Sequence, residues 1–422
     1  MKPDKTAEVI EFVEKRREEI IEFLRKLISF PSVTGDEAEI QKFIAAKLEN
    51  MGLTVDMWEP DQSELSKHPA YAQPKGPYTN RPNVVGIYKG TGNGKSLLFN
   101  GHVDVVPTGP LESWEHQPWS GDIEGNRLYG RGTSDMKSGL ATMTMALDIL
   151  LQMGIKPKGD IFLEYTMDEE LTGNGTLACV AKGYKADAGI CCETSSMHVQ
   201  PGCIGRIWFE IMVHGKPAGI QRAWEGVNAI EKGYAIVQAV SDLGNIRVNE
   251  LSHPLYPDVR GSLPCMITVF QAGSYQSAFP DTCLLKGSFA TLPGEDTNDV
   301  KKRFVEHILT FCKTDPWLKD NPPEVNFVGY CGDPADIPPD HPIVKAVSRN
   351  FTIVTGSEPQ ITGRQGAADI RYLIKYSNTP TVIFGPGLTE QMHATNEWVD
   401  INNLVTATKI VALTIMEWCG YE

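Results

Sequence analysis

The chain contains histidine and acidic residues of the types that bind divalent metal ions. The candidates are His102, Asp104, Asp135, Glu169, Glu170, Glu193 and His393. Imidazole nitrogens and carboxylate oxygens are the ligands that Zn²⁺ takes in catalytic sites, and the large carboxylate share also suits Mn²⁺ or Co²⁺. Together these residues predict metal-assisted hydrolysis, in which a bound cation activates water.

Each of these residues also has a simpler interpretation when it is considered alone. His102 and Asp104 form a His-x-Asp pair, which either orients an imidazole toward a metal or is an ordinary loop histidine beside an acid. Asp135 precedes a predicted helix, so it either caps that helix or bridges two cations.

The acidic run at positions 168–170 follows a buried strand. It is either a solvated loop or a cluster whose mutual repulsion a cation relieves. If Glu170 binds the metal, its neighbour Glu169 lies within reach of the attacking water as a general base.

Four of the candidate residues share one kind of position, just after the end of a predicted strand. His102, Glu170, Glu193 and His393 follow, in turn, the expected strands Ser96–Asn100, Gly159–Thr166, Ala188–Cys192 and Thr381–Phe384. The strands of an open α/β sheet direct their carboxyl ends at one crevice, so we expect the candidates to meet there.

Two domains are expected from the order of elements and from the length of 422 residues, which exceeds a single core of roughly 250–300 residues. Alternating strands and helices predict an α/β domain with a mostly parallel sheet over 1–203 and 323–422. The first helix is expected over Thr6–Phe30, and another over Thr133–Met153. Residues 204–322 read as an inserted α+β domain of βαββαβ order.

The segment Gly90–Ser96 (Gly-Thr-Gly-Asn-Gly-Lys-Ser) is similar to a phosphate-binding loop but lacks its first glycine, because Lys89 stands there. A strand rather than a helix is expected after it, contrary to that motif. We therefore predict the tip of a β-hairpin.

Composition excludes several classes of function. The 39 Lys and Arg against 53 Asp and Glu give a net charge of −14, which disfavours nucleic-acid binding. No apolar stretch approaches the ~18–20 residues of a membrane span, and the charged N-terminus is no signal peptide. Nine cysteines without a CxxC spacing predict no disulfide framework. We expect a cytoplasmic protein that binds neither nucleic acid nor a membrane.

The motifs GHVDVVP, LYGRGTSDMKSG, DEE, the acid after Cys-Cys and MHATNEW are jointly specific. Through them nearly the whole chain resembles the dinuclear metal-dependent hydrolases that include acetylornithine deacetylase, succinyl-diaminopimelate desuccinylase, aminoacylase and glutamate carboxypeptidase. The resemblance implies two divalent ions per subunit, Zn²⁺ foremost with Mn²⁺ or Co²⁺ as alternatives, which share a hydroxide. It also implies a homodimer, or a larger homo-oligomer, formed through the inserted domain, which serves as a lid.

The resemblance also implies a role for each candidate. His102 and Glu193 would hold one metal, and Glu170 and His393 the other. Asp135 would bridge both and be followed by a cis peptide bond. Glu169 would be the general base, and Asp104 would orient the first histidine; these two are the predicted catalytic residues.

The inserted domain departs from the family pattern at three positions. Gly219 stands where the family has a histidine that stabilises the developing oxyanion, Ser277 replaces an asparagine, and Ala290 replaces an arginine. An oxyanion donor contributes about 2.7–4 kcal/mol to transition-state stabilisation. An ordinary peptide substrate is therefore not expected.

Three explanations of this departure remain open: Arg222, His214 or His253 replaces the histidine, the enzyme is inactive, or the substrate is altered. If the substrate is altered, we expect a hydrolase that cleaves a C–N bond of a small molecule. An alternative reaction is hydrolytic deamination of an electron-poor aromatic amine, as in nitroanthranilate aminohydrolase-like members of the family. A non-catalytic metal-dependent binding protein is the alternative of another class. The predicted substrate contacts are Arg222, His253, Tyr275 and Arg364.

Overall fold

A computed structural model describes residues 5–422; the first four residues, part of the segment predicted not to be a signal peptide, lie outside it. The chain forms two compact units. Unit 1 comprises the residues up to Gly202 together with Asp336–Thr362 and Asp369–Glu422, and unit 2 comprises Cys203–Ala335 and Gly363–Ala368. The predicted end of the insertion at residue 322 must be corrected to 335, because the strand that follows residue 322 pairs within unit 2.

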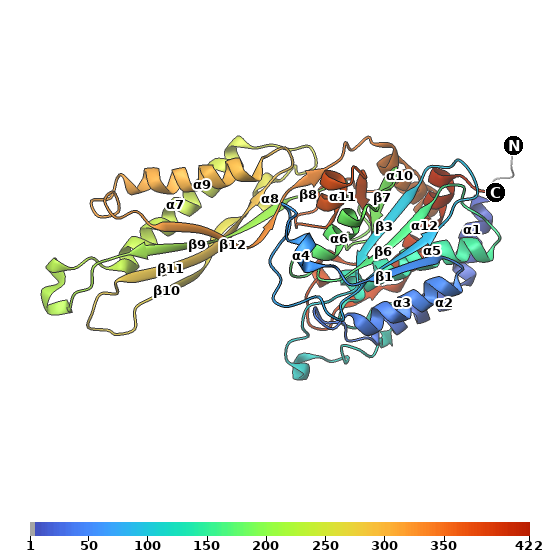
Figure 1. Ribbon diagram of the computed structural model, residues 1–422, viewed down its shortest axis with the longest axis horizontal. Coiled ribbons are helices and arrows are strands. Elements are labelled where there is room, and N and C mark those ends of the chain that lie inside the picture. Colours follow the sequence, from blue (N-terminus) through green and yellow to red (C-terminus); the bar gives the residue numbers. More distant parts are fainter. Residues whose placement is uncertain (1–4) are drawn as a thin grey trace. The chain divides into compact units, whose positions relative to one another are not determined.

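Unit 1 is built on a six-stranded sheet (Figure 1). Its strands, in spatial order, are β1 (Thr54–Trp58), β2 (Asn83–Tyr88), β6 (Ile161–Thr166), β3 (Leu97–His102), β7 (Ala188–Cys191) and β14 (Thr381–Ile383). The last four are mutually parallel, and only β2 runs against both of its neighbours. The sheet is therefore mixed but mostly parallel, as predicted.

Helices cover both faces of this sheet. They are α1 (Thr6–Lys15), α2 (Arg17–Ile28), α3 (Ala38–Asn50), α4 (Gln62–Leu65), α5 (Ser138–Gln152), α6 (Asn174–Lys182), α10 (Pro342–Thr355), α11 (Ile370–Tyr376) and α12 (Ile401–Cys419). Side chains alternate across a strand, so Leu97 and Phe99 of β3 join the large core with α5 and α12, whereas Leu98 packs with α6 and α11.

Small sheets complete unit 1. They are the sheet of β4 (Ile123–Glu124), β5 (Arg127–Tyr129) and β15 (Trp398–Asp400), and the pair of two-residue strands β8 (Gly202–Cys203) and β13 (Ala335–Asp336). Among residues 5–422, no helix is long and apolar enough to span a membrane. None of the cysteines forms a disulfide in this described part of the chain.

Three local expectations were wrong. The single helix over Thr6–Phe30 is two helices that meet at Arg16, which lets Val9 of the first and Leu24 of the second face the core. The helix expected from Thr133 begins only at Ser138, after an irregular turn. The segment Gly90–Ser96 is not a hairpin tip, because β6 lies between the two strands it joins.

Unit 2 has the expected βαββαβ order. Its antiparallel sheet contains, in spatial order, β10 (Cys265–Ala272), β11 (Thr282–Thr291), β9 (Gly205–His214) and β12 (Glu324–Gly332), and its longer helices are α7 (Ala229–Glu250) and α9 (Thr297–Cys312), with the short α8 (Val259–Ser262). Both long helices lie along the sheet (Figure 1). Phe209 and Phe289 pack against Phe304 of α9 with ring centroids 4.6 and 4.8 Å apart, respectively.

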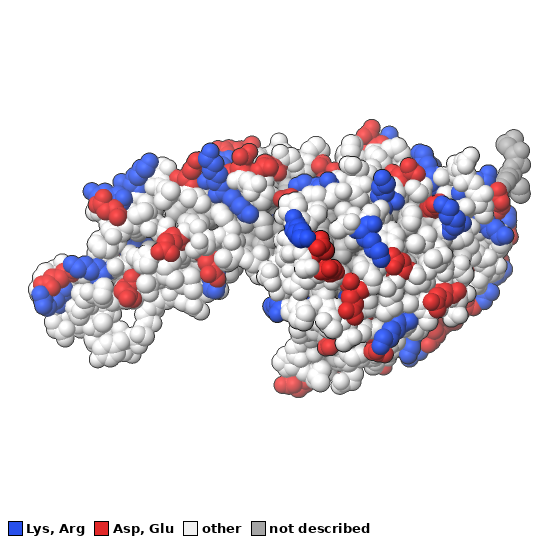
Figure 2. Space-filling view, in the orientation of Figure 1, with Lys and Arg blue, Asp and Glu red and all other residues white. Residues whose placement is uncertain are grey.

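Charged side chains of both signs are interspersed on the face of the molecule shown in Figure 2. No continuous basic surface is visible on that face. On that face, acidic side chains therefore lie among basic ones.

Candidate metal centre

Three of the predicted ligands lie at the carboxyl ends of neighbouring parallel strands. His102 is the last residue of β3, Glu170 follows β6, and Glu193 follows β7. Asp135 lies in the irregular turn Thr133–Lys137 before α5, and His393 follows the short helix Thr389–Gln391. Parallel strands thus bring three of the five candidate ligands to the carboxyl end of the sheet, as the sequence predicted.

The five side chains form two adjoining groups that share Asp135. His102 Nε2 lies 3.2 Å from Asp135 Oδ1 and 3.8 Å from Glu193 Oε1. His393 Nε2 lies 3.1 Å from Glu170 Oε2 and 3.5 Å from Asp135 Oδ2. Each carboxylate oxygen of Asp135 therefore faces a different histidine, which is the grouping expected for a bridging ligand.

Asp135 is not the helix cap that was its simpler interpretation. The residue at the cap position of α5 is Lys137, and no side chain caps that end of the helix. The backbone at Asp135 is extended, with φ −116° and ψ 94°, and the peptide bond to Met136 is cis, as the resemblance implied.

Asp104 contacts His102 in a different way from the one expected. His102 Nδ1 lies 2.8 Å from the backbone carbonyl oxygen of Asp104 and 3.7 Å from its carboxylate Oδ1. A carbonyl only accepts, so Nδ1 carries a proton, and Nε2 is the ring nitrogen that faces the other candidate ligands. The Asp104 carboxylate instead accepts hydrogen bonds from the backbone amides of Glu169 (3.1 Å) and Glu170 (3.2 Å).

Burial and clustered charge change the acid–base properties of the site. Burial raises the pKa of Glu169 well above its usual range and also raises the pKa of Glu170. Burial lowers the pKa of His102, but Asp135 and neighbouring carboxylates outweigh it and leave that pKa well above the usual value. Hydrogen bonds to Asp135 and Glu170 raise the pKa of His393 to about 10. The cluster thus holds concentrated negative charge that positive charge stabilises.

The residues present fit a pair of divalent metal ions. Candidate ligand atoms of His102, Asp135 and Glu170 lie within 4.8 Å of one another. Glu170 Oε1 is buried and has no hydrogen-bond partner, so one lone-pair face remains for a ligand. Glu169 Oε2 lies 3.8 Å from His102 Nε2, beside this donor set.

Asp168, the first acid of the run, belongs to a separate buried network that the sequence analysis did not identify. Arg81 Nη2 donates to Asp168 Oδ1 (2.7 Å) and to Glu37 Oε1 (2.6 Å), and Tyr78 Oη donates to Asp168 Oδ2 (3.0 Å). Asp168 has a left-handed backbone (φ 64°), which the network holds in place. This acid therefore anchors the loop that carries Glu169.

The four predicted substrate contacts all lie in unit 2, whereas the histidine–carboxylate cluster is built within unit 1. Arg222 is exposed and pairs with Glu225. His253 packs against Tyr256, with ring centroids 5.4 Å apart. Arg364 is 9 % exposed, and its carbonyl accepts a hydrogen bond of 3.1 Å from the Tyr256 hydroxyl. Their role in substrate binding stays a prediction.

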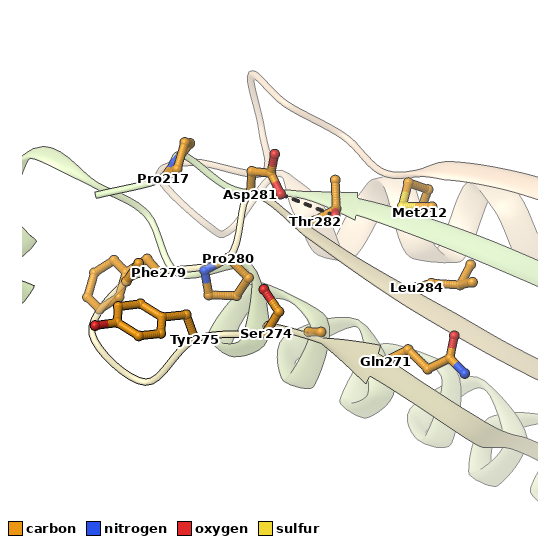
Figure 3. Close-up of a pocket in the computed structure, with 13 residues that line it drawn as sticks. Met212, Pro217, Gln271, Ser274, Tyr275, Phe279, Pro280, Asp281, Thr282 and Leu284 are labelled. Carbon is orange, nitrogen blue, oxygen red and sulfur yellow. Dashed lines mark hydrogen bonds between the residues drawn. The ribbon is translucent and has the colours of Figure 1, made fainter. Parts of the chain in front are cut away.

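Tyr275 lines a hollow of about 560 Å³ in unit 2, at the loop that joins β10 and β11 (Figure 3). Figure 3 shows Tyr275 with Phe279 and Pro280 on that loop. The side chain of Tyr275 is 68 % exposed.

The three residues that depart from the family pattern, Gly219, Ser277 and Ala290, lie in two separate parts of unit 2. Gly219 pairs with Ala278 in an isolated bridge, next to Ser277 in sequence, whereas Ala290 is buried in β11. His214, one suggested substitute for the missing histidine, contacts Glu324 with Nε2 3.2 Å from Oε1.

The sequence is similar to a known peptidase family and to characterised amide hydrolases. The sequence model of peptidase family M20/M25/M40 matches residues 98–417. An N-formyl-4-amino-5-aminomethyl-2-methylpyrimidine deformylase from Bacillus subtilis is 31% identical, over 97% of this chain and 96% of its own. A succinyl-diaminopimelate desuccinylase from Variovorax paradoxus is 26% identical, over 94% of this chain and 97% of its own.

Solved structures share the fold at lower sequence identity. The M20 family metallo-carboxypeptidase Sso-CP2 from Sulfolobus solfataricus superposes with a TM-score of 0.72 at 18% identity, over 94% of this chain and 98% of its own. A dinuclear metal-binding peptidase of the M20 family from Bacillus subtilis gives a TM-score of 0.66 at 16% identity, over 96% of this chain and 99% of its own.

Proposed function

Because this chain belongs to peptidase family M20/M25/M40, we propose that it is a metal-dependent hydrolase that removes an acyl group from a nitrogen of a small molecule. The observation that carries this proposal is the placement of His102 and His393 on opposite oxygens of Asp135, with Glu169 beside them. The names of the deformylase and desuccinylase relatives support a non-peptide C–N bond as the target.

The chain supplies ligands, a base and a rigid frame for this reaction. His102 and Glu193 would hold one metal, His393 and Glu170 the other, and Asp135 would contact both. When bound, two divalent cations supply the Lewis acidity that activates water and polarises the scissile group.

Glu169 would move the proton. Its carboxylate accepts a proton from the attacking water and returns it to the leaving nitrogen, so that the C–N bond breaks and an amine and an acid are released. The backbone amide of Glu169 donates to the Asp104 carboxylate, which keeps this base in place during both transfers.

A second candidate function follows from Gly219, which has no side chain to stabilise a carbonyl oxyanion. In hydrolytic deamination of an electron-poor aromatic amine, water attacks a ring carbon, and the developing charge spreads into the ring instead. This reaction would release ammonia.

A substrate screen of metal-replete protein separates these functions. Preparations loaded with Zn²⁺, Mn²⁺ or Co²⁺ are offered N-formyl, N-acetyl and N-succinyl amines, dipeptides and electron-poor anilines, and released amine and ammonia are measured. We expect turnover of an N-acyl amine, with dipeptides poor. Ammonia from an aniline with every amide inert would overturn the proposal in favour of deamination, and no turnover with two metals bound would favour a binding protein.

We also propose that the protein is a homodimer formed through unit 2, as the family resemblance implies. Sedimentation equilibrium measures this directly, and a mass of one chain across the micromolar range would contradict it.

A further inference from the structure

Glu397 is a fully buried acid between His393 and β15. Its Oε1 accepts the backbone amides of Ser134 (2.8 Å) and Asp135 (3.0 Å). Its Oε2 accepts the backbone amide of Gly132 (2.8 Å) and Arg131 Nη1 (2.7 Å). Each oxygen of this carboxylate therefore has two donors.

All four donors belong to the short segment 131–135, which ends at the acid shared by the two histidines. This segment has an irregular backbone, with Gly132 left-handed (φ 83°) and Asp135 extended, so its amides do not form the regular backbone hydrogen bonds of a helix or a sheet. Buried amides need acceptors, and Glu397 provides them for three of its residues.

The same contacts tie this segment to the one that carries His393. Arg131 Nη1 also donates to the backbone carbonyl of Ala394, the residue after His393, at 3.0 Å. Two ligand-bearing segments more than 250 residues apart in sequence are thus joined through Arg131 and Glu397.

We infer that Glu397 is a positioning residue that fixes the carboxylate of Asp135 between the two cation sites. The inference rests on the proposed metal binding at Asp135. Glu397 itself is not expected to contact the metal or the substrate and would act through Asp135. Residues that orient metal ligands in this way typically change metal affinity or activity by about 10–100-fold when they are replaced.

The glutamine variant probes this role because it keeps size and removes acceptor capacity. An amide has one oxygen and an NH₂ group that only donates, so two of the four donors around residue 397 would face another donor. Glu397→Asp keeps both oxygens but shortens the side chain by one methylene, so it should retain more function than Glu397→Gln.

The matched control is Glu295→Gln in unit 2. Glu295 Oε2 also accepts an arginine, Arg247 Nη2 (2.7 Å), and a backbone amide, that of Leu292 (2.8 Å). This variant removes the same kind of contact without touching the cluster of unit 1.

The experiment titrates each metal-free protein with Zn²⁺ and Co²⁺ by calorimetry and records the Co²⁺ d–d absorption spectrum. We expect Glu397→Gln to bind at least one ion about 10–100-fold more weakly with an altered spectrum. Glu397→Asp should fall between it and wild type, and Glu295→Gln should match wild type. Where turnover is measurable, kcat should fall with little change in KM.

Wild-type affinity and spectrum in Glu397→Gln, with a loss of thermal stability like that of Glu295→Gln, would show a merely structural acid and overturn the inference. Should Glu397→Gln fail to fold, Glu397→Asp decides by the same criteria. Failure of wild type to bind two ions, by contrast, would overturn the proposed function itself, so the two failures are distinguishable.

Discussion

At the scale of single residues, Glu169 and Glu170 are neighbours in sequence whose side chains lie near different histidines. Glu170 Oε2 lies 3.1 Å from His393 Nε2, whereas Glu169 Oε2 lies 3.8 Å from His102 Nε2. Both backbone amides donate to the Asp104 carboxylate, so one buried acid orients the pair. The backbone of both residues is thus held by the same carboxylate, while their side chains extend toward different histidines.

Replacing Glu169 by glutamine should lower kcat about 10²–10⁴-fold, because an amide of the same size cannot accept the proton of water. Metal content, measured by mass spectrometry of the dialysed protein, should stay at two ions per chain. Glu112→Gln, at an exposed acid in the short helix Leu111–Ser113, is the control and should match wild type. Turnover within a few-fold of wild type in Glu169→Gln would assign the base elsewhere.

That the candidate ligands lie together could be predicted from the sequence, because residue type and position near a strand end were both visible. His102 ends its strand, and Glu170 and Glu193 follow theirs; the hydrophobic runs of these strands are short and clear. The supports could not be predicted in this way. Arg81 reaches Asp168 across 87 positions, and Glu397 reaches Asp135 across 262, so these contacts depend on tertiary packing that no local pattern encodes.

At the scale of elements, helix α5 packs closely against the segment that carries Glu193 through Gly139. A Cβ atom at Gly139 would lie 1.7 Å from the carbonyl oxygen of Cys192, the residue before Glu193. Only a glycine allows α5 to approach the end of β7 this closely. The contact therefore couples the helix that follows Asp135 to the strand that precedes Glu193.

Gly139→Ala should destabilise the protein by about 1–3 kcal/mol through overpacking, although alanine alone would favour the helix by about 1 kcal/mol. It should also weaken metal binding, because either the helix or the backbone at Cys192 must move. Denaturant unfolding and a Zn²⁺ titration measure both effects. The control is Gly76→Ala, since a Cβ there meets no atom within 4 Å. Equal behaviour of the two variants would refute the close approach.

The elements themselves were predicted unevenly. The βαββαβ order of unit 2 agrees with the expectation, because the alternating burial along a strand such as β9 reports its buried face directly. The order of strands in the sheet was harder, since β6 enters between β2 and β3 from a distant part of the chain. The break at Arg16 separates two helices that share one continuous apolar pattern.

At the scale of the whole molecule, the candidate ligands all belong to unit 1 while unit 2 folds around its own core. Binding of metal should therefore stabilise the two units unequally. A ligand at 100 times its Kd stabilises the state that binds it by about 2.7 kcal/mol.

Hydrogen–deuterium exchange with and without Zn²⁺ tests this expectation. We expect slower exchange at the ligand-bearing segments 131–139, 167–173 and 391–398 when Zn²⁺ is present, reversed by a chelator. The strands β9 to β11 of unit 2 should exchange at an unchanged rate. Protection confined to unit 2, or none in the three segments, would contradict the assignment of the ligands.

The split layout of unit 1 also sets the order in which the ligands are made. Glu170 and His393 are 223 positions apart, and the main segment of unit 2 is synthesised between them. At typical synthesis rates of about 5–20 residues per second, the nascent chain carries Glu170 without His393 for roughly 11–45 s. A chain interrupted before His393 would therefore contain the main segment of unit 2 but lack one of the five candidate ligands.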